Sequence, residues 1–153
     1  MSIHAILAKG AISPPRGLRE VEAGAGAHVL VVDDDAAIRD TLRLALEDAG
    51  YQVEGVADGV TALNRLRTAS ERYIVLLDLI MPGMGGQAVL ADIANDNQIA
   101  TRHAYILVTA AQERLTTAGI ESTLARLSAP ILHKPFDLDV LLTMVSEAQQ
   151  RLG

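Results

Sequence analysis

Residues 29–32 form a short run of β-preferring apolar residues, Val-Leu-Val-Val, which ends on three consecutive aspartates at positions 33–35. An apolar run without polar alternation is typical of a strand buried on both faces of a parallel sheet. Three adjacent carboxylates repel one another unless a cation lies between them. Asp34 or, in preference, Asp35 would cap the following helix, but a cap accounts for a single acid. We therefore predict a buried strand that ends at a site for a hard cation such as Mg²⁺.

Strand-like and helix-like segments alternate along the chain from His28 onward. Further strands are predicted at residues 51–56, 73–78, 105–109 and 130–133, and the helices between them include 84–96 and 112–127. Asp58 and Asp137 are expected to cap two of the helices. Five strands that alternate with five helices predict an α/β domain, a parallel sheet with helices on both faces.

Apolar residues at helical spacing predict which side of each helix is buried. The predicted stripes are Ile38, Leu42, Leu44, Ala45 and Leu46 in the helix that ends near Gly50, Ala62, Leu63 and Leu66 in the next, and Leu138, Leu141, Leu142 and Val145 in the last.

Chemically suggestive residues follow four of the predicted strands: Asp33, Asp34 and Asp35 after the first, Asp78 after the third, Thr109 after the fourth and Lys134 after the fifth. Ligands of parallel α/β sheets bind outside the carboxyl ends of the strands, where the strand order reverses. Together these groups suit phosphoryl transfer to a carboxylate. Asp78 would be the nucleophile, the acids would hold Mg²⁺, and Lys134 and Thr109 would contact the phosphoryl group. Lys134 is one of only two lysines, against eleven arginines.

Composition excludes several other classes of protein. The net charge of −6 argues against nonspecific nucleic-acid binding, which needs a basic face. No apolar run is long enough to cross a membrane, and the N-terminus lacks the basic region of a secretory signal. The chain has no cysteine, which removes disulfides and thiolate metal ligands. These features predict a cytoplasmic domain.

Residues 1–27 differ from the rest of the chain. They contain Pro14, Pro15 and a Gly-Ala-Gly-Ala stretch at 24–27, with no sustained periodicity. We predict a flexible extension here and a folded domain at 28–153. The Gly-Ala-Gly precedes a strand, whereas the glycines of a dinucleotide-binding site follow one, so it does not indicate such a site.

Four segments resemble the receiver domain of bacterial two-component response regulators: Val31-Val32-Asp33-Asp34, the run from Leu77 to Met84, Val108-Thr109-Ala110 and Lys134-Pro135-Phe136. The resemblance covers about residues 28–150. It implies a flavodoxin-like doubly wound (βα)5 fold with strand order 2-1-3-4-5.

The resemblance also implies the roles of individual residues. Asp78 would be the phosphoacceptor. Asp33 (through water), Asp34, Asp78 and the backbone carbonyl of Ile80 would hold Mg²⁺. Thr109, the backbone of Ala110 and Lys134 would bind the phosphoryl group.

The implied phosphodonor is a histidine kinase or a histidine phosphotransfer protein. A face made by the fourth helix, fifth strand and fifth helix would contact a downstream protein or a second copy. The domain would signal rather than act as an enzyme, apart from catalysing transfer to its own aspartate. Because the chain ends directly after the last predicted helix, we expect a receiver without an output domain.

Some positions depart from the family pattern. An aromatic residue often stands three positions before the lysine, where this chain has Ile131, so the aromatic half of the usual switch is in doubt. Gly85 stands where aspartate is common, and residues 113–129 lack the usual Gly-Ala-Asp signal. Ile80 is bulky and apolar beside the acceptor, which predicts a long-lived aspartyl phosphate.

Two other functions compete with this one. A haloacid-dehalogenase-like phosphatase would use the run at 33–37, but Ala37 fails its Asp-x-Asp-x-Thr/Val motif and Asp78 is left without a role. A pseudo-receiver that only binds partners would not need the complete set of acids, threonine and lysine. His103 and His133 lack further ligands at suitable spacing, so we interpret them as ordinary polar residues rather than a zinc or phosphotransfer site.

Overall fold

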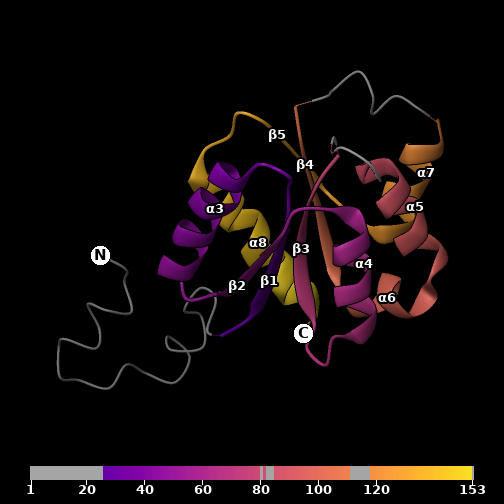
Figure 1. Cartoon of the computed structure of the whole chain (residues 1–153), viewed down its shortest axis with the longest axis horizontal. Helices are drawn as coiled ribbons and strands as arrows, with labels where there is room; N and C mark the ends of the chain where they lie inside the picture. The colour runs from indigo at the N-terminus through magenta and orange to yellow at the C-terminus, as the bar shows by residue number, and fades with distance from the viewer. Residues whose placement is uncertain (1–25, 80, 82–84, 111–117, 153) are drawn as a thin grey trace, which may run out of the picture.

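The computed structural model describes residues 26–79, 81, 85–110 and 118–152. Its strands form one parallel sheet in the order β2-β1-β3-β4-β5 (Figure 1). The strands are β1 (His28–Val32), β2 (Gln52–Val56), β3 (Tyr73–Asp78), β4 (Ala104–Thr109) and β5 (Ile131–His133). The described helices are α3 (Ala36–Asp48), α4 (Gly59–Thr68), α5 (Gly86–Asn95), α6 (Asn97–Arg102), α7 (Ala118–Leu127) and α8 (Leu138–Leu152). The predicted α/β class and strand order are confirmed.

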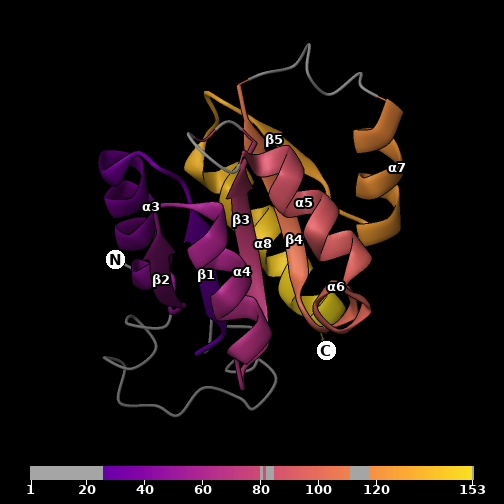
Figure 2. The same ribbon diagram turned by 45° about the vertical axis from the view of Figure 1, so that its right-hand side comes forward.

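Helices cover both faces of the sheet (Figures 1 and 2). One core layer packs α4, α5, α6 and α7 against the sheet, and the other packs α3 and α8 against its opposite face. The run at 29–32 shows why both layers are needed. Val29 and Val31 point into the α3/α8 layer, whereas Leu30 and Val32 point into the other, and all four are buried. A strand buried on both faces is therefore confirmed.

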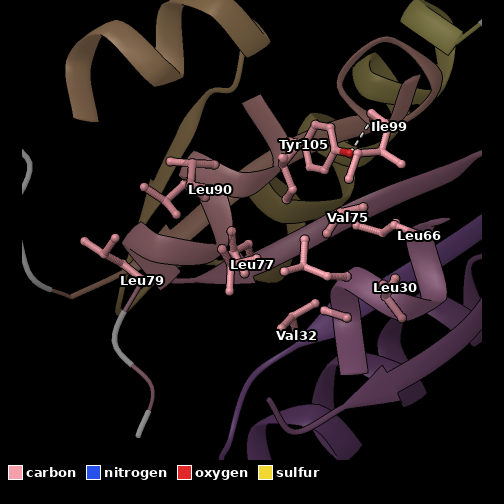
Figure 3. Close-up of a cluster of buried hydrophobic side chains, with 14 of the residues drawn as sticks. Leu30, Val32, Leu66, Val75, Leu77, Leu79, Leu90, Ile99 and Tyr105 are labelled. Atoms are coloured by element: carbon pink, nitrogen blue, oxygen red, sulfur yellow. Dashed lines mark hydrogen bonds between the residues drawn. The ribbon is translucent and has the colours of Figure 1, made fainter. Parts of the chain in front are cut away.

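The larger core layer is built from aliphatic side chains, with tyrosines at its edge (Figure 3). Leu77 and Val75 of β3 lie at its centre, beside Val32 of β1 and Leu90 of α5. The hydroxyl of Tyr105 donates a 2.7 Å hydrogen bond to the backbone carbonyl of Ile99, which satisfies its polar atom inside the core.

Two helix starts follow the sequence prediction. The carboxylate of Asp35 accepts hydrogen bonds from the backbone N–H groups of Ala37 and Ile38 at the start of α3. Asp58 accepts a 2.8 Å bond from the N–H of Thr61 at the start of α4. These side chains replace partners that the first turn of a helix lacks. Asp137 directly precedes α8, and its backbone carbonyl accepts a bond from Leu141, while its side-chain cap stays a prediction.

The helix predicted at 84–96 corresponds to α5, and it is followed by a short helix that was not predicted. Helix α5 begins at Gly86 and ends at Asn95, and a separate short helix, α6, follows at once. Asp96 separates the two because it has extended backbone and its side chain accepts from the N–H of Gln98, as an N-cap does. The described chain therefore has six helices instead of the five predicted.

Two residues of the predicted stripes lie on the surface. Leu44 is 70% exposed, because at 100° per residue it lies about 200° around α3 from the buried Leu42 and Leu46. Leu138 is 43% exposed in the first turn of α8, whereas Leu141 and Val145 further along are fully buried.

Some predictions fall wholly or partly outside the described residues. The predicted helix at 112–127 is described only from Ala118 onward. The extension predicted at 1–27 lies outside for residues 1–25, so its flexibility stays a prediction. Within the part of the chain that the structure describes, no helix has both the length and the apolar character to cross a bilayer.

Candidate functional site

The acidic residues meet at the edge of the sheet where the strand order reverses. Strands β1 and β3 pair in parallel, with Val32 opposite Leu77, so the residues that follow emerge side by side. A carboxylate oxygen from each of Asp33, Asp34 and Asp78 lies within 4.8 Å of the others. Sequence spacing alone could not show this proximity, which depends on β2 and β3 flanking β1.

Lys134 brings a positive charge to these acids from the loop after β5, an edge strand of the sheet. Its ammonium nitrogen lies 3.2 Å from Oδ2 of Asp33 and 3.7 Å from Oδ2 of Asp78. Asp33 and Asp78 are buried, at 3% and 7% exposed, so their charges need compensation. One lysine facing three carboxylates leaves a formal local charge of −2 when all are ionised.

The loop that carries Asp33 is fixed by contacts with the backbone. The Asp33 N–H donates to the carbonyl of Val56 at the end of β2, and Oδ1 of Asp33 accepts a 2.9 Å bond from the N–H of Asp35. Arg39 of α3 donates a 2.7 Å bond to the carbonyl of Asp33. The sequence analysis missed Arg39, and no motif marks its role.

The three consecutive acids have three different environments. Asp33 is buried and bonded through both carboxylate oxygens. Asp34 is exposed, and the structure gives its side chain no hydrogen bond or ion pair among the described residues. Asp35 caps α3, as expected. Asp34 is therefore the acid of the run whose oxygens are available to a ligand from solvent.

Thr109 is the last residue of β4, and Ala110 follows it at the sheet edge that carries the acidic cluster. Thr109 is fully buried, and its backbone carbonyl accepts a 2.9 Å bond from the N–H of Lys134. This bond ties the strand end of Thr109 to the loop of Lys134. Ala110 follows on the surface. Ile80, the fourth predicted metal ligand, lies outside the described residues.

Gly86 allows the loop after Asp78 to fold back closely onto β3. Its N–H donates a 2.8 Å bond to the carbonyl of Leu79. A Cβ atom at this position would lie 2.3 Å from the Asp78 carbonyl oxygen and 2.5 Å from Cα of Leu79. Only glycine fits without a backbone shift. Gly86 was not predicted as a site residue, although the Gly85-Gly86 pair inside the helix predicted at 84–96 was a usable signal.

The donor set suits a hard divalent cation. Three carboxylates from two adjacent strand ends converge, one of them exposed to solvent, and Mg²⁺ favours a few carboxylates with several waters. The described part of the chain has no cysteine, and no histidine joins this cluster.

His103 and His133 lie outside the acidic cluster. His103 is buried beside the opposite edge of the sheet, where its Nδ1 accepts a 2.9 Å bond from the N–H of Tyr73. Its Nε2 lies 3.3 Å from the carbonyl of Leu66. Burial is the main reason why the pKa of His103 lies below its usual value. His133 is exposed at the end of β5.

The residue three positions before Lys134 is part of the core. Ile131 is half-buried and packs against the larger core layer, beside the residues of α7. A branched aliphatic side chain thus occupies the position where the resemblance to receiver domains implies an aromatic ring.

The family model of the response regulator receiver domain matches residues 29–146. The chain belongs to this family. Receiver domains are signalling domains of two-component systems that interact with histidine kinases. The predicted resemblance is therefore confirmed over nearly the whole described domain.

Similar proteins agree with this assignment. The transcriptional regulatory protein CseB of Streptomyces coelicolor is 31% identical over 127 residues, which cover 82% of this chain and 50% of that protein. The CheY-like receiver of Methanospirillum hungatei superposes with a TM-score of 0.70 at 27% identity, covering 82% of this chain and 96% of that one.

A third similar receiver was solved with a ligand. The response regulator TrrA of Thermotoga maritima, in complex with Mg²⁺–BeF, has a TM-score of 0.66 at 26% identity and covers 80% of this chain and 98% of that one. The chain spans about half the length of the curated relatives it matches.

Proposed function

We propose that this receiver accepts a phosphoryl group on Asp78 from a histidine kinase or a histidine phosphotransfer protein. A carboxylate oxygen of Asp78 attacks phosphorus, a P–O bond forms, the P–N bond to the donor histidine breaks, and the imidazole leaves with its electron pair and takes up a proton. The observation that carries this proposal is the convergence of Asp33, Asp34, Asp78 and the Lys134 ammonium at one sheet edge.

The proposed metal ligands are Asp34, Asp78, Asp33 through water, and the Ile80 carbonyl. When bound, Mg²⁺ neutralises oxygens of the incoming phosphoryl group. The local charge of −2 and the exposed Asp34 favour a cation there, and the Mg²⁺–BeF complex of the similar receiver TrrA supports the choice of metal. Asp33 already accepts bonds from Lys134 and the N–H of Asp35, which fits a water-mediated role.

The switch would act through Lys134, Thr109 and the backbone of Ala110. Hydrogen bonds to charged groups contribute roughly 1.5–3 kcal/mol each, so the two side-chain contacts contribute on the order of 3–6 kcal/mol. Inverting a two-state equilibrium from 1:99 takes about 5.5 kcal/mol. Phosphorylation could therefore shift the loop after β4 and helix α7 substantially.

The proposed output surface is the face of α7, β5 and α8, where a downstream protein or a second copy of the chain would bind. The absence of nucleic-acid binding stays a prediction, based on the net charge of −6.

The test is labelling by acetyl phosphate with Mg²⁺, read by intact mass. We expect stoichiometric labelling of the wild-type chain, none with EDTA and none for Asp78→Asn. Asp48→Asn, which changes an exposed acid at the end of α3, is the matched control and should label normally. Normal labelling of Asp78→Asn would refute the acceptor assignment.

The same experiment separates the competing functions. A pseudo-receiver would not be labelled under any condition. A dehalogenase-like phosphatase would turn over a phosphate ester in a manner that depends on Asp33 and not on Asp78.

A further inference from the structure

A cavity lies at the amino ends of the strands, opposite the carboxyl ends that carry the acidic cluster. Its volume is about 500 Å³, within the size range of small-molecule sites, and its lining includes Arg67, Arg72, Arg102 and Gln98. Arg72 directly precedes β3, whereas Asp78 ends it. At the rise of a parallel strand the two positions are about 20 Å apart. The cavity is therefore separate from the proposed phosphorylation site.

Three different segments supply the arginines. Arg67 comes from the last turn of α4, Arg72 from the residue directly before β3, and Arg102 from the last turn of α6. The lower ends of α4 and α6 and the C-terminal end of the chain lie at the same edge in Figures 1 and 2. Cations are favourable at helix C-termini, which accounts for Arg67 and Arg102. That effect does not account for Arg72.

Each guanidinium is held in place by a single contact in the described part of the chain. Arg67 pairs with Asp96 at 3.3 Å, Arg72 donates to the carbonyl of Leu152 at 3.0 Å, and Arg102 donates to the carbonyl of Ser70. A guanidinium has five N–H donors, so most of the donors remain available. The Nε–H of Arg102 is buried and has no acceptor among the described residues.

The charge balance at this cavity is positive, although the whole chain carries −6. Asp96 is the one carboxylate that forms an ion pair with these three arginines within the described ranges. The positive field reaches His103, since Arg102 and Arg72 both help to lower its pKa, after the larger effect of burial. Guanidinium groups bind phosphate through parallel hydrogen bonds as well as charge.

From this convergence of three guanidiniums on one cavity we propose a binding site for a compact anion that carries phosphate groups, such as a diphosphate or the diphosphate of a nucleotide. Arg72 and Arg102 would contact the phosphate oxygens, and Arg67 would contribute charge from its ion pair with Asp96. The side chain of Gln98 lines the same cavity and can add a neutral donor.

The test is titration of the full chain with inorganic pyrophosphate at low ionic strength and with EDTA, which removes metal-dependent binding at the acidic site. Calorimetry gives the affinity, and NMR follows the Arg102 Nε–H and the His103 ring. We expect saturable binding with shifts of both signals. Arg72→Gln and Arg102→Gln should each lower the affinity by about tenfold or more.

Arg65→Gln is the matched control. It removes the same charge from α4, the helix that carries Arg67, but Arg65 pairs with Glu54 at 2.9 Å and does not line the cavity. The control should bind within about twofold of wild type, because the Arg65 guanidinium is already paired with Glu54 and lies outside the cavity lining. Circular dichroism shows whether each variant is folded. If Arg102→Gln does not fold, Arg72→Gln still tests the proposal, because it changes an exposed side chain.

A parallel titration with ADP separates the two sources of a diphosphate. Tighter binding of ADP assigns the site to a nucleotide, and equal binding assigns it to the diphosphate alone. The proposal is overturned by the absence of binding at millimolar pyrophosphate, or by an equal loss in Arg65→Gln. It is also overturned if Asp78→Asn abolishes binding, since that would place the anion at the acidic site.

Discussion

The ammonium nitrogen of Lys134 lies 3.2 Å from Oδ2 of Asp33, although the two residues are 101 positions apart in the chain. The contact joins the loop after β5 to the loop after β1 across the width of the central strands. It places one positive charge against buried carboxylates that would otherwise repel each other. The stability of the domain and the chemistry of the site therefore share this ion pair.

We expect Lys134→Ala to lower the free energy of unfolding by about 1–3 kcal/mol, less than for a fully buried pair because the lysine side chain is partly exposed. Urea denaturation followed by circular dichroism measures this change. Added Mg²⁺ should recover part of the loss, because a divalent cation can compensate Asp33 and Asp78 in place of the ammonium. A variant with wild-type stability in EDTA would contradict this interpretation of the ion pair.

Gly86→Ala should lower the free energy of unfolding by about 1–3 kcal/mol, the usual cost of overpacking. The reason is that the Cβ of the alanine would overlap the backbone of Asp78 and Leu79. Gly85→Ala is the matched control. A Cβ there meets its nearest atom, the Met81 carbonyl oxygen, at 3.9 Å, which is ordinary contact. The midpoint of urea unfolding should fall for Gly86→Ala alone. Equal midpoints would show that the backbone around Gly86 shifts at little cost in free energy.

The neighbouring acids Asp34 and Asp35 should differ in their effects. Asp35→Ala removes two capping bonds from α3 and should cost about 1 kcal/mol of stability while labelling by acetyl phosphate continues. Asp34→Ala removes an exposed side chain without described partners, so stability should change little while Mg²⁺-dependent labelling falls sharply. Measuring the stability and the labelling of both variants separates the helix cap from the metal ligand. A loss of labelling in Asp35→Ala and a loss of stability in Asp34→Ala would exchange the two roles.

Stability should depend on pH through His103. Its neutral Nδ1 accepts the N–H of Tyr73, and burial lowers its pKa below the usual value of about 6.5. The unfolded chain therefore binds the proton more readily than the folded chain. The contribution of the neutral imidazole is fully present above about pH 6.5 and is lost as the pH falls through the lower pKa of the folded state.

Urea denaturation between pH 5 and 8, for wild type and His103→Gln, isolates this contribution. The variant should be less stable at pH 8, and the difference between the two proteins should shrink toward pH 5. A difference that is constant with pH would show that the pKa of His103 is the same in the folded and unfolded chains, which would contradict a shift caused by burial.

Much of the fold follows from local patterns. The run at 29–32, with no polar alternation, predicted a strand buried on both faces, and Asp35 and Asp58 predicted the starts of two helices. These features depend on neighbours within a few residues. Helix α6 was not predicted, because its six residues are too few for an apolar stripe and only the side chain of Asp96, which accepts from the N–H of Gln98, marks its start. Leu44 was misplaced because it stands between two buried leucines in sequence but faces away from them on the helix.

The sequence by itself determined the residue types at the strand ends and, through their order, the family. Strand ends can be located from apolar runs, and a parallel sheet brings its carboxyl ends to one edge. The tertiary structure decided which of these residues meet. It separated Asp33, Asp34 and Asp35 into a buried, an exposed and a capping acid, and it required glycine at position 86. These distinctions depend on distances between segments far apart in sequence, which no local pattern contains.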